Sequence, residues 1–246
     1  MSLDGRTILV TGAARGLGAE IARSLAGRGA RLVLADIAEE EGRSLAGELG
    51  ADFHPVDLGD PGSIEALGAA MAEKPGGALH GLVNNGAIAT GIGGVGFEDI
   101  ELDTWDRVMR VNVRGTWLMT RAVAGPLRAS GSGRVVNVAS DTALWGAPNL
   151  LSYVASKGAV ISMTRSLARE LGPARVGVTA VAPGILTTES TEYVPEARHR
   201  FYAEGRAVPG THGPGEITGV IGFLLGEGAL ALTGQVLPVN NGFVFT

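Results

Sequence analysis

An apolar strand that runs directly into a glycine-rich turn is the feature that most restricts how this chain can fold. Residues 7–10 form a short apolar run, residues 11–18 have the sequence Thr-Gly-Ala-Ala-Arg-Gly-Leu-Gly, and a helical pattern follows near residues 17–28. Glycines in such a turn let backbone amides approach a pyrophosphate, which the positive N-terminus of the next helix attracts. The turn therefore predicts a dinucleotide site, with an ordinary glycine-rich turn as the alternative. Its predicted cofactor contacts are Gly12, Arg15, Gly16, Leu17 and Gly18.

The alternation of strand and helix patterns continues to the end of the chain. Apolar runs predict further strands near residues 31–35, 52–56, 79–84, 133–139, 175–182 and 234–239, with helical patterns between them. Repeated strand–helix units imply an α/β fold in which helices cover both faces of a parallel sheet. Because the 246 residues contain no linker, charge block or sequence repeat, we expect one domain over residues 1–246.

Composition argues against several classes of protein. The formal net charge of −5 disfavours a nucleic-acid partner, whose binding depends largely on Lys and Arg. No apolar run approaches the roughly 18 residues of a membrane helix, and the start of the chain has no signal-peptide pattern. The four His are scattered and Cys is absent, so we expect neither a metal site nor thiol chemistry. A cytoplasmic protein is the default expectation.

Two aspartates at the ends of predicted strands bear on the choice of cofactor. The Asp36 carboxylate can accept hydrogen bonds from both ribose hydroxyls of NAD and would repel the 2′-phosphate of NADP. Asp36 can also cap the helix that follows it, and the two roles can coexist. Asp57 can likewise meet the adenine ring or cap the helix that starts near Pro61. Arg15 could pair with a 2′-phosphate, but residue 37 is Ile rather than a basic residue. We therefore expect NAD to be preferred over NADP by at least about tenfold.

A Tyr-x-x-x-Lys pair predicts proton transfer. Tyr153 and Lys157 are four residues apart and share one face of a predicted helix. A tyrosine hydroxyl has a reference pKa of about 10, and a neighbouring ammonium lowers that pKa towards a value suited to proton exchange with an alcohol. Of the three Tyr, Tyr153 alone is followed by Lys at this spacing. Tyr202 is followed by Arg206, which we expect to form a solvent-exposed helix pair with it.

Ser140 strengthens this assignment. It ends the strand predicted near residues 133–139, 13 residues before Tyr153. In open α/β sheets, ligands bind where the carboxyl ends of strands meet the starts of the following helices. We therefore expect the Ser140 hydroxyl to hydrogen-bond a substrate oxygen, with a helix or turn cap as the alternative.

With these motifs the sequence resembles the short-chain dehydrogenase/reductase family. The matching residues occur in the family's order over nearly the whole chain: Thr11-Gly12-x-x-x-Gly16-x-Gly18, Asp57, Asn84-Asn85, Asn112, Ser140, Tyr153-x-x-x-Lys157, Pro183-Gly184 and Thr233-Gly234-Gln235. The resemblance implies a single-domain, Rossmann-type, doubly wound parallel sheet of about seven strands. It also implies an NAD-dependent oxidoreductase that interconverts a secondary alcohol and its ketone, with Tyr153 as general acid and base.

The resemblance assigns further site residues. It implies that Asn112 holds the water that connects Lys157 to solvent, whereas spacing alone suggests a tolerated polar residue within a helix. The catalytic set is then Asn112, Ser140, Tyr153 and Lys157. The cofactor contacts beyond the glycine-rich turn are Asp36, Asp57, Leu58, Asn85, Gly86, Tyr153, Lys157, Pro183, Gly184, Ile185 and Thr187.

The chain departs from the family pattern at two places. It has Asn84-Asn85-Gly86-Ala87 where the family usually has Asn-Asn-Ala-Gly. It ends on Val239-Asn240-Asn241-Gly242 where the family has Asp or Asn followed by two Gly. The first departure moves a glycine by one position beside the predicted cofactor site, and neither changes the catalytic set.

The stretch from about residue 186 to residue 213 is predicted to be a lid over the substrate. It holds Tyr193, Phe201 and Tyr202, and Trp145 lies between Ser140 and Tyr153. One interpretation is an aromatic-lined pocket for an apolar, cyclic or aromatic secondary alcohol or its ketone. The other is an amphipathic helix with its aromatic residues in the core and its Arg in water. The predicted substrate contacts are Ser140, Trp145, Tyr153, Phe201 and Tyr202.

Other functions and the state of assembly stay open. A ketoacyl reductase or a sugar dehydrogenase of the same family would use the same catalytic set. A lyase or epimerase that returns the hydride usually carries a longer substrate domain, and a non-catalytic NAD sensor would be expected to lack the Ser, Tyr or Lys. The helix after Tyr153 is apolar on all sides, so we expect a second copy of the chain to cover one face, in a homotetramer or homodimer.

Overall fold

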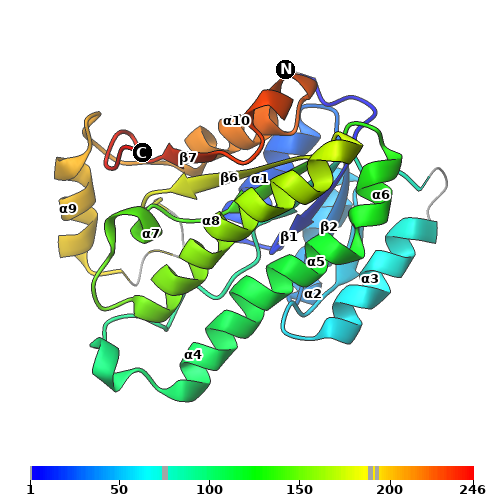
Figure 1. The fold of residues 1–246 in the computed structure, drawn as a ribbon. Coiled ribbons are helices and arrows are strands. Elements are labelled where there is room, and N and C mark those ends of the chain that lie inside the picture. The colour runs from blue at the N-terminus through cyan, green and yellow to red at the C-terminus, as the bar shows by residue number, and fades with distance from the viewer. Residues whose placement is uncertain (1, 74–76, 188–190, 192–193) are drawn as a thin grey trace.

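A parallel sheet of seven strands forms the centre of the molecule (Figure 1). The structure is a computed structural model that describes residues 2–73, 77–187, 191 and 194–246. The strands are β1 Thr7–Thr11, β2 Arg31–Asp36, β3 Asp52–Pro55, β4 Gly81–Asn84, β5 Arg134–Val138, β6 Gly177–Pro183 and β7 Val236–Val239. They lie in the order β3-β2-β1-β4-β5-β6-β7, and each neighbouring pair is parallel. The predicted doubly wound α/β sheet is confirmed.

The order of the strands determines where a ligand can bind. The chain winds from β1 outward to β3, returns to the other side of β1 with β4, and then winds outward to β7. In such sheets, ligands bind at the carboxyl ends of the strands where the winding direction reverses. Here that point lies between β1 and β4, so the glycine-rich turn after β1 borders it.

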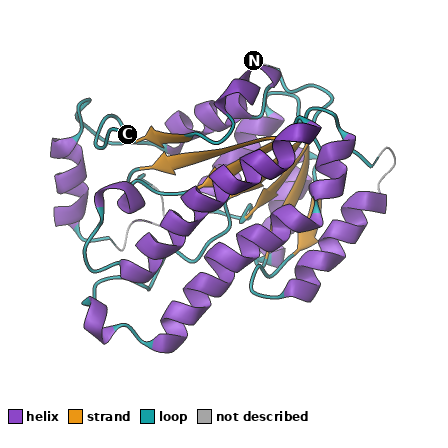
Figure 2. Cartoon of the chain, in the orientation of Figure 1, coloured by secondary structure: helices purple, strands orange, loops and turns teal. Residues whose placement is uncertain are grey.

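Helices cover both faces of the sheet (Figure 2). One layer contains α1 Gly16–Ala26, α2 Glu39–Leu49 and α10 Pro214–Leu224. The opposite layer contains α3 Pro61–Glu73, α5 Thr116–Ala122, α6 Ala124–Ala129 and α8 Leu151–Leu171. Two helices, α7 Thr142–Trp145 and α9 Glu196–Gly205, lie beyond the end of the sheet to which the arrowheads of β6 and β7 point (Figure 1).

The apolar strands are explained by this three-layer arrangement. A strand that is covered on both faces needs apolar residues at every position rather than at alternate ones. In β1, Ile8 and Val10 pack into one core with Ile217 of α10, whereas Leu9 packs into the other core with Ile64 of α3. Ile8, Leu9 and Val10 have no exposed surface.

Shorter helical segments complete the chain. They are the 3-10 turns η1 Phe97–Asp99, η3 Gly172–Ala174 and η5 Glu227–Leu232, and the π-helical segment η2 Met109–Gly115, which joins α4 Leu102–Val108 to α5. Segments of π-helix occur frequently at functional sites, and η2 contains Asn112. Among the helices of the described residues, none is long and apolar enough to cross a membrane.

Candidate active site

The glycine-rich turn and the loop after β4 meet backbone to backbone. Gly12 has a φ of +63°, and a Cβ on Gly12 would lie 2.5 Å from the Cα of Gly86. A Cβ on Gly86 would in turn lie 3.1 Å from the backbone nitrogen of Gly12. The unusual order Asn84-Asn85-Gly86-Ala87 therefore places a glycine at the point where this loop touches the turn.

Hydrogen bonds hold these two loops together. The Thr11 hydroxyl oxygen accepts from the backbone N–H groups of Asn85 and Gly86, each at 3.1 Å. The Asn85 side-chain amide donates to the carbonyls of Thr11 at 3.1 Å and Gly12 at 2.9 Å. Predicted cofactor residues from the first and second halves of the sheet thus form one rigid surface at the point where the winding reverses.

The Asp36 carboxylate lies at the end of β2 and faces the glycine-rich turn. Its Oδ2 accepts from the backbone N–H of Ala14 at 2.9 Å, and its Oδ1 accepts from that of Ala38 at 3.0 Å. Since α2 begins at Glu39 with Ala38 as its N-cap, the helix-cap alternative for Asp36 is wrong. Each carboxylate oxygen can accept a second hydrogen bond, so acceptors remain for ribose hydroxyls. Arg15, the residue after Ala14 in the turn, is exposed.

Asp57 forms a tight turn after β3. Its Oδ1 accepts from the backbone N–H of Gly59 at 2.7 Å. The residue directly before α3 is Asp60, which accepts from the N–H of Gly62 at 2.9 Å as a helix N-cap does. The helix-cap alternative for Asp57 is therefore wrong as well. The next residue, Leu58, packs against the loop after β4 and so borders the predicted cofactor site.

Asn112 connects the loop after β4 to α8. Its Oδ1 accepts from the backbone N–H of Ile88 at 2.7 Å, and its Nδ2 donates to the carbonyl of Ile88 at 3.0 Å and to the Ser156 hydroxyl at 3.1 Å. The Ser156 hydroxyl donates in turn to the carbonyl of Tyr153 at 2.7 Å. Asn112 is therefore more than a tolerated polar helix residue, because its whole amide bridges two parts of the site.

Tyr153 and Lys157 lie on the same face of α8, as predicted. The Lys157 side chain is buried, and its Nζ lies 5.6 Å from the centroid of the Tyr153 ring. Nζ donates to the carbonyl of Val138 at 2.7 Å, which ties α8 to the end of β5. Burial lowers the pKa of Lys157 to about 8. An ammonium in this position favours the ionised form of a neighbouring phenol, because little solvent screens the two charges.

Ser140 follows β5 by two residues. Its hydroxyl oxygen accepts from the backbone N–H of Thr142 at 3.3 Å and from the Thr142 hydroxyl at 2.9 Å. The turn-cap alternative is thus correct, since these bonds order the first turn of α7. Both bonds use the Ser140 oxygen as acceptor, so its hydrogen is left to donate to a substrate oxygen, and the two predicted roles are compatible.

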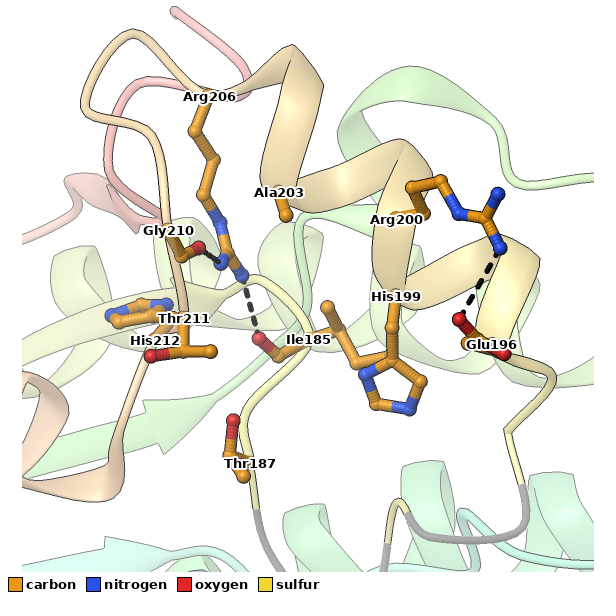
Figure 3. Close-up of a pocket in the computed structure, with 10 residues that line it drawn as sticks. All are labelled: Ile185, Thr187, Glu196, His199, Arg200, Ala203, Arg206, Gly210, Thr211 and His212. Atoms are coloured by element: carbon orange, nitrogen blue, oxygen red, sulfur yellow. Dashed lines mark hydrogen bonds and ion pairs between the residues drawn. The ribbon is translucent and has the colours of Figure 1, made fainter.

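The predicted cofactor residues Pro183, Gly184, Ile185 and Thr187 lie at the end of β6 and in the segment after it, next to the predicted lid. The backbone N–H of Thr187 donates to the carbonyl of His212 at 2.9 Å. A cavity of about 240 Å³ lies between this segment and α9, and Thr187, His199 and Arg206 are among the residues that line it (Figure 3). The segment after β6 is therefore braced by the part of the chain that follows α9.

Comparisons with known proteins agree over almost the whole chain. A family model described as enoyl-(acyl carrier protein) reductase matches residues 12–244. A 3-alpha-(or 20-beta)-hydroxysteroid dehydrogenase of Mycobacterium tuberculosis is 36% identical over 98% of this chain and 90% of that protein. A 3-oxoacyl-(acyl-carrier-protein) reductase of Thermotoga maritima is 34% identical over 99% of this chain and all of that protein. A solved short-chain type dehydrogenase/reductase from Mycobacterium ulcerans superposes with a TM-score of 0.93 at 25% identity, over 99% of this chain and 91% of that one.

The chain belongs to the short-chain dehydrogenase/reductase family. It is therefore an oxidoreductase, and members of this family typically use nicotinamide cofactors. The residues present fit such a cofactor, because Gly12 leaves the turn without a side chain and Asp36 keeps acceptors free beside it.

One expectation about the lid of this dehydrogenase/reductase is wrong. Tyr202 and Arg206 are both buried rather than solvent-exposed. The Arg206 guanidinium donates to the carbonyl of Ile185 at 2.7 Å and to that of Gly210 at 2.6 Å, as Figure 3 shows. One carbonyl from the chain after α9 and one from the segment after β6 thus accept from the guanidinium that the helical spacing alone places in water.

An aromatic cluster joins the predicted lid to the site, and we define it as Trp145, Phe201, Tyr202 and Phe243. The Tyr202 and Phe243 rings stack with centroids 4.2 Å apart, and Trp145 lies 5.7 Å from Phe201. Tyr202 is buried, as the amphipathic-helix interpretation expects, whereas Phe201 keeps 49% of its surface exposed, and its contact with a substrate stays a prediction. Sequence reasoning missed Phe243, which has no local pattern to mark it; Tyr193 lies outside the described residues.

Proposed function

We propose that this protein is an NAD-dependent dehydrogenase that interconverts an apolar, cyclic or aromatic secondary alcohol and its ketone. The observation that carries the proposal is the buried Lys157 ammonium beside the Tyr153 ring, at the strand end that carries Ser140. NAD, when bound, supplies the acceptor or donor of the hydride. In this proposal Ser140 orients the substrate oxygen, Tyr153 exchanges its proton, and Lys157 stabilises the tyrosinate. Asn112 holds the loop after β4 against α8 and keeps the predicted water in reach of Lys157.

The environment of Asp36 supports NAD rather than NADP. Two backbone N–H groups fix its carboxylate beside the glycine-rich turn, where a 2′-phosphate would meet a like charge. The next residue, Ile37, is 68% exposed and offers no cation to a phosphate. Arg15 is exposed and free to turn into water, so the fixed carboxylate outweighs it.

The aromatic cluster supports an apolar, cyclic substrate. Trp145 belongs to α7, which begins two residues after Ser140, so the cluster adjoins the predicted substrate oxygen site. The name of the mycobacterial relative also points to a secondary alcohol on a fused ring system. The name of the Thermotoga relative favours the second candidate, a ketoacyl reductase.

A substrate panel separates these candidates. We expect kcat/KM with NAD to rise with the apolar area of cyclic secondary alcohols and to stay low for polyols and for 3-oxoacyl thioesters. Tyr153→Phe serves as the control; it should lose turnover by about 100-fold or more while still binding NADH, because the hydroxyl moves the proton and the ring only packs. A preference for the thioester would reject the alcohol assignment, and an active Tyr153→Phe variant would reject the proton-transfer role.

We also propose that the protein assembles as a homotetramer or homodimer. On α8 the apolar side chains of Val154, Ala155, Ala159 and Met163 are only half-buried in the single chain, and Trp117 of α5 is 44% exposed. A second copy would cover this apolar surface. Size-exclusion chromatography with light scattering tests the proposal, and a monomer at every concentration would contradict it. A cytoplasmic location stays a prediction of the sequence.

A further inference from the structure

Asp141, the residue after Ser140, is a carboxylate without exposed surface. Its backbone N–H donates to the carbonyl of Pro183 at 2.9 Å, which joins the ends of β5 and β6. Its Oδ1 accepts from the Tyr202 hydroxyl at 2.8 Å, and its Oδ2 accepts from the Asn240 side-chain amide at 3.2 Å. One side chain thus connects the catalytic strand end, the lid helix α9 and the segment that follows β7.

The contact to Tyr202 reaches the whole aromatic cluster. The Trp145 indole N–H donates to the Tyr202 hydroxyl at 3.1 Å, so this hydroxyl both receives a hydrogen bond and passes one to Asp141. Phe243 stacks on the Tyr202 ring and lies three residues after Asn240, the second donor to Asp141. Both segments that bring aromatic rings to Trp145 are therefore fastened to the same carboxylate.

The burial of this charge makes a geometric role the better explanation than a stabilising one. Moving a carboxylate out of water is costly, and the hydrogen bonds offset only part of that cost, so burial raises the pKa of Asp141 to about 6. An apolar residue of similar size would remove the cost but could not accept from two donors on two separate segments. Hydrogen bonds to a carboxylate are also roughly twice as strong as those between neutral groups.

We propose that Asp141 is a positioning residue that holds the aromatic cluster beside Ser140 and thereby sets the selectivity for bulky apolar alcohols. It does not touch the reacting atoms; it acts through Tyr202 and Asn240. When the Asp141 carboxylate is removed, α9 and the C-terminal segment become more mobile, and a large substrate loses the aromatic cluster against which it packs. A small substrate, which needs only Ser140 and Tyr153, is affected much less. The proposal rests on the proposed dehydrogenase function.

Three variants and one control test this role. Asp141→Ala removes both acceptors, Asp141→Asn keeps an acceptor for Tyr202, and Tyr202→Phe removes one hydroxyl while keeping the ring. The matched control is Asp103→Ala, at an exposed carboxylate on α4. We expect Asp141→Ala to raise KM for a bulky cyclic alcohol by about tenfold or more, against less than about threefold for 2-butanol. Asp141→Asn should restore most of the loss, Tyr202→Phe should show the same discrimination even if Asp141→Ala does not fold, and the control should match wild type.

A measurement that needs no substrate, amide hydrogen exchange, tests the positioning role of Asp141 independently of the proposed dehydrogenase function. Amide hydrogen exchange in α9 should quicken by about tenfold in Asp141→Ala, stay near wild type in Asp141→Asn, and stay slow in β1 of both variants. If the wild-type protein oxidises no alcohol, the proposed dehydrogenase function is rejected. Amide hydrogen exchange still tests whether Asp141 holds α9 in place. Unchanged exchange in α9, or an equal loss of kcat for small and bulky alcohols, would overturn the positioning role.

Discussion

At the scale of single residues, the proposed role of Lys157 depends on the burial of its ammonium group. The chain contains only two Lys, and this one is buried with its Nζ 2.7 Å from the carbonyl of Val138. The planar guanidinium of Arg is larger than an ammonium and directs its N–H groups along different lines. The spacing from Tyr153 predicted the helix face, but only the fold shows that the space around Nζ is closed.

We therefore expect Lys157→Arg to lose kcat by about 100-fold or more although the charge is retained. Lys157→Met is the matched variant, because it keeps the length of the side chain and removes the charge. If the ammonium stabilises the tyrosinate, steady-state kinetics should show a large loss for both variants. Near-wild-type turnover in Lys157→Met would mean that the charge is not required.

The cofactor preference is tested at Asp36. Asp36→Ala removes the acceptor for the ribose hydroxyls and for the N–H of Ala14, so KM for NAD should rise by about tenfold or more with little change in kcat. Asp36→Asn keeps one acceptor but no charge, and it should improve the use of NADP without the full loss for NAD. Initial rates with both cofactors give the ratio of kcat/KM, and an unchanged ratio in both variants would contradict the proposed role.

The site residues that could be identified from the sequence differ in one physical respect from those that could not. Gly12, Tyr153 and Lys157 belong to short motifs, so their spacing carries the information. Tyr202 and Asn240, the hydrogen-bond partners of Asp141, are 61 and 99 residues away along the chain, and no local sequence pattern predicts such contacts. The positions of the motif residues relative to the sheet were therefore predictable, whereas the contacts of Asp141 with Tyr202 and Asn240 were not.

At the scale of elements, strands and long helices were predictable from apolar runs, but local irregularities were not. The π-helical segment η2 contains the same kinds of residues as an ordinary α-helix. The sequence therefore does not reveal the wider, π-helical turns around Asn112. The error over Arg206 has a similar origin, because the i,i+4 rule treats a helix in isolation. Here Gly210, in the stretch after α9, and Ile185, in the segment after β6, each supply a carbonyl acceptor to Arg206.

The Arg206 contacts predict that α9 is held at its C-terminal end by one side chain. Arg206→Met leaves the carbonyls of Ile185 and Gly210 without this donor, which should lower the free energy of unfolding by about 2 kcal/mol. Arg200→Met on the same helix removes only an exposed pair with Glu196 and should cost less than about 1 kcal/mol. Urea titrations of both variants check this, and equal effects would show that the burial of Arg206 contributes nothing.

At the scale of the whole molecule, the alternation of strands and helices together with the family motifs predicted a doubly wound parallel sheet, and the structure adds the order of its strands. Parallel strands joined by helices permit few arrangements, because crossover connections are right-handed and short. The order β3-β2-β1-β4-β5-β6-β7 is one of these, and it brings the motifs after β1, β4, β5 and β6 to one end of the sheet. The alternation of strands and helices does not predict where α7, α9 and the C-terminal segment lie, because their positions depend on side-chain contacts beyond the sheet.

The stability of the whole molecule should depend on pH through Asp141. Burial raises its pKa from 3.8 to about 6, against the opposing effects of Tyr202, Asn240 and the positive charge of Arg206. Because the folded pKa lies above the unfolded one, the carboxyl group contributes most to stability below about pH 4, and this contribution is lost as pH rises through about 6. The full loss amounts to about 3 kcal/mol, of which about half falls between about pH 5 and about pH 8.

Asp141→Asn cannot titrate, so it isolates this effect from all other groups. The variant should gain stability relative to wild type by about 1 to 2 kcal/mol when the pH of a urea titration is raised from about 5 to about 8. Both proteins must be compared at one concentration, because assembly would also contribute to the measured stability. The sign is the decisive part: a carboxylate held mainly by its hydrogen bonds would make the variant lose stability relative to wild type over the same range. That result would mean that Tyr202 and Asn240 outweigh the cost of burying the charge.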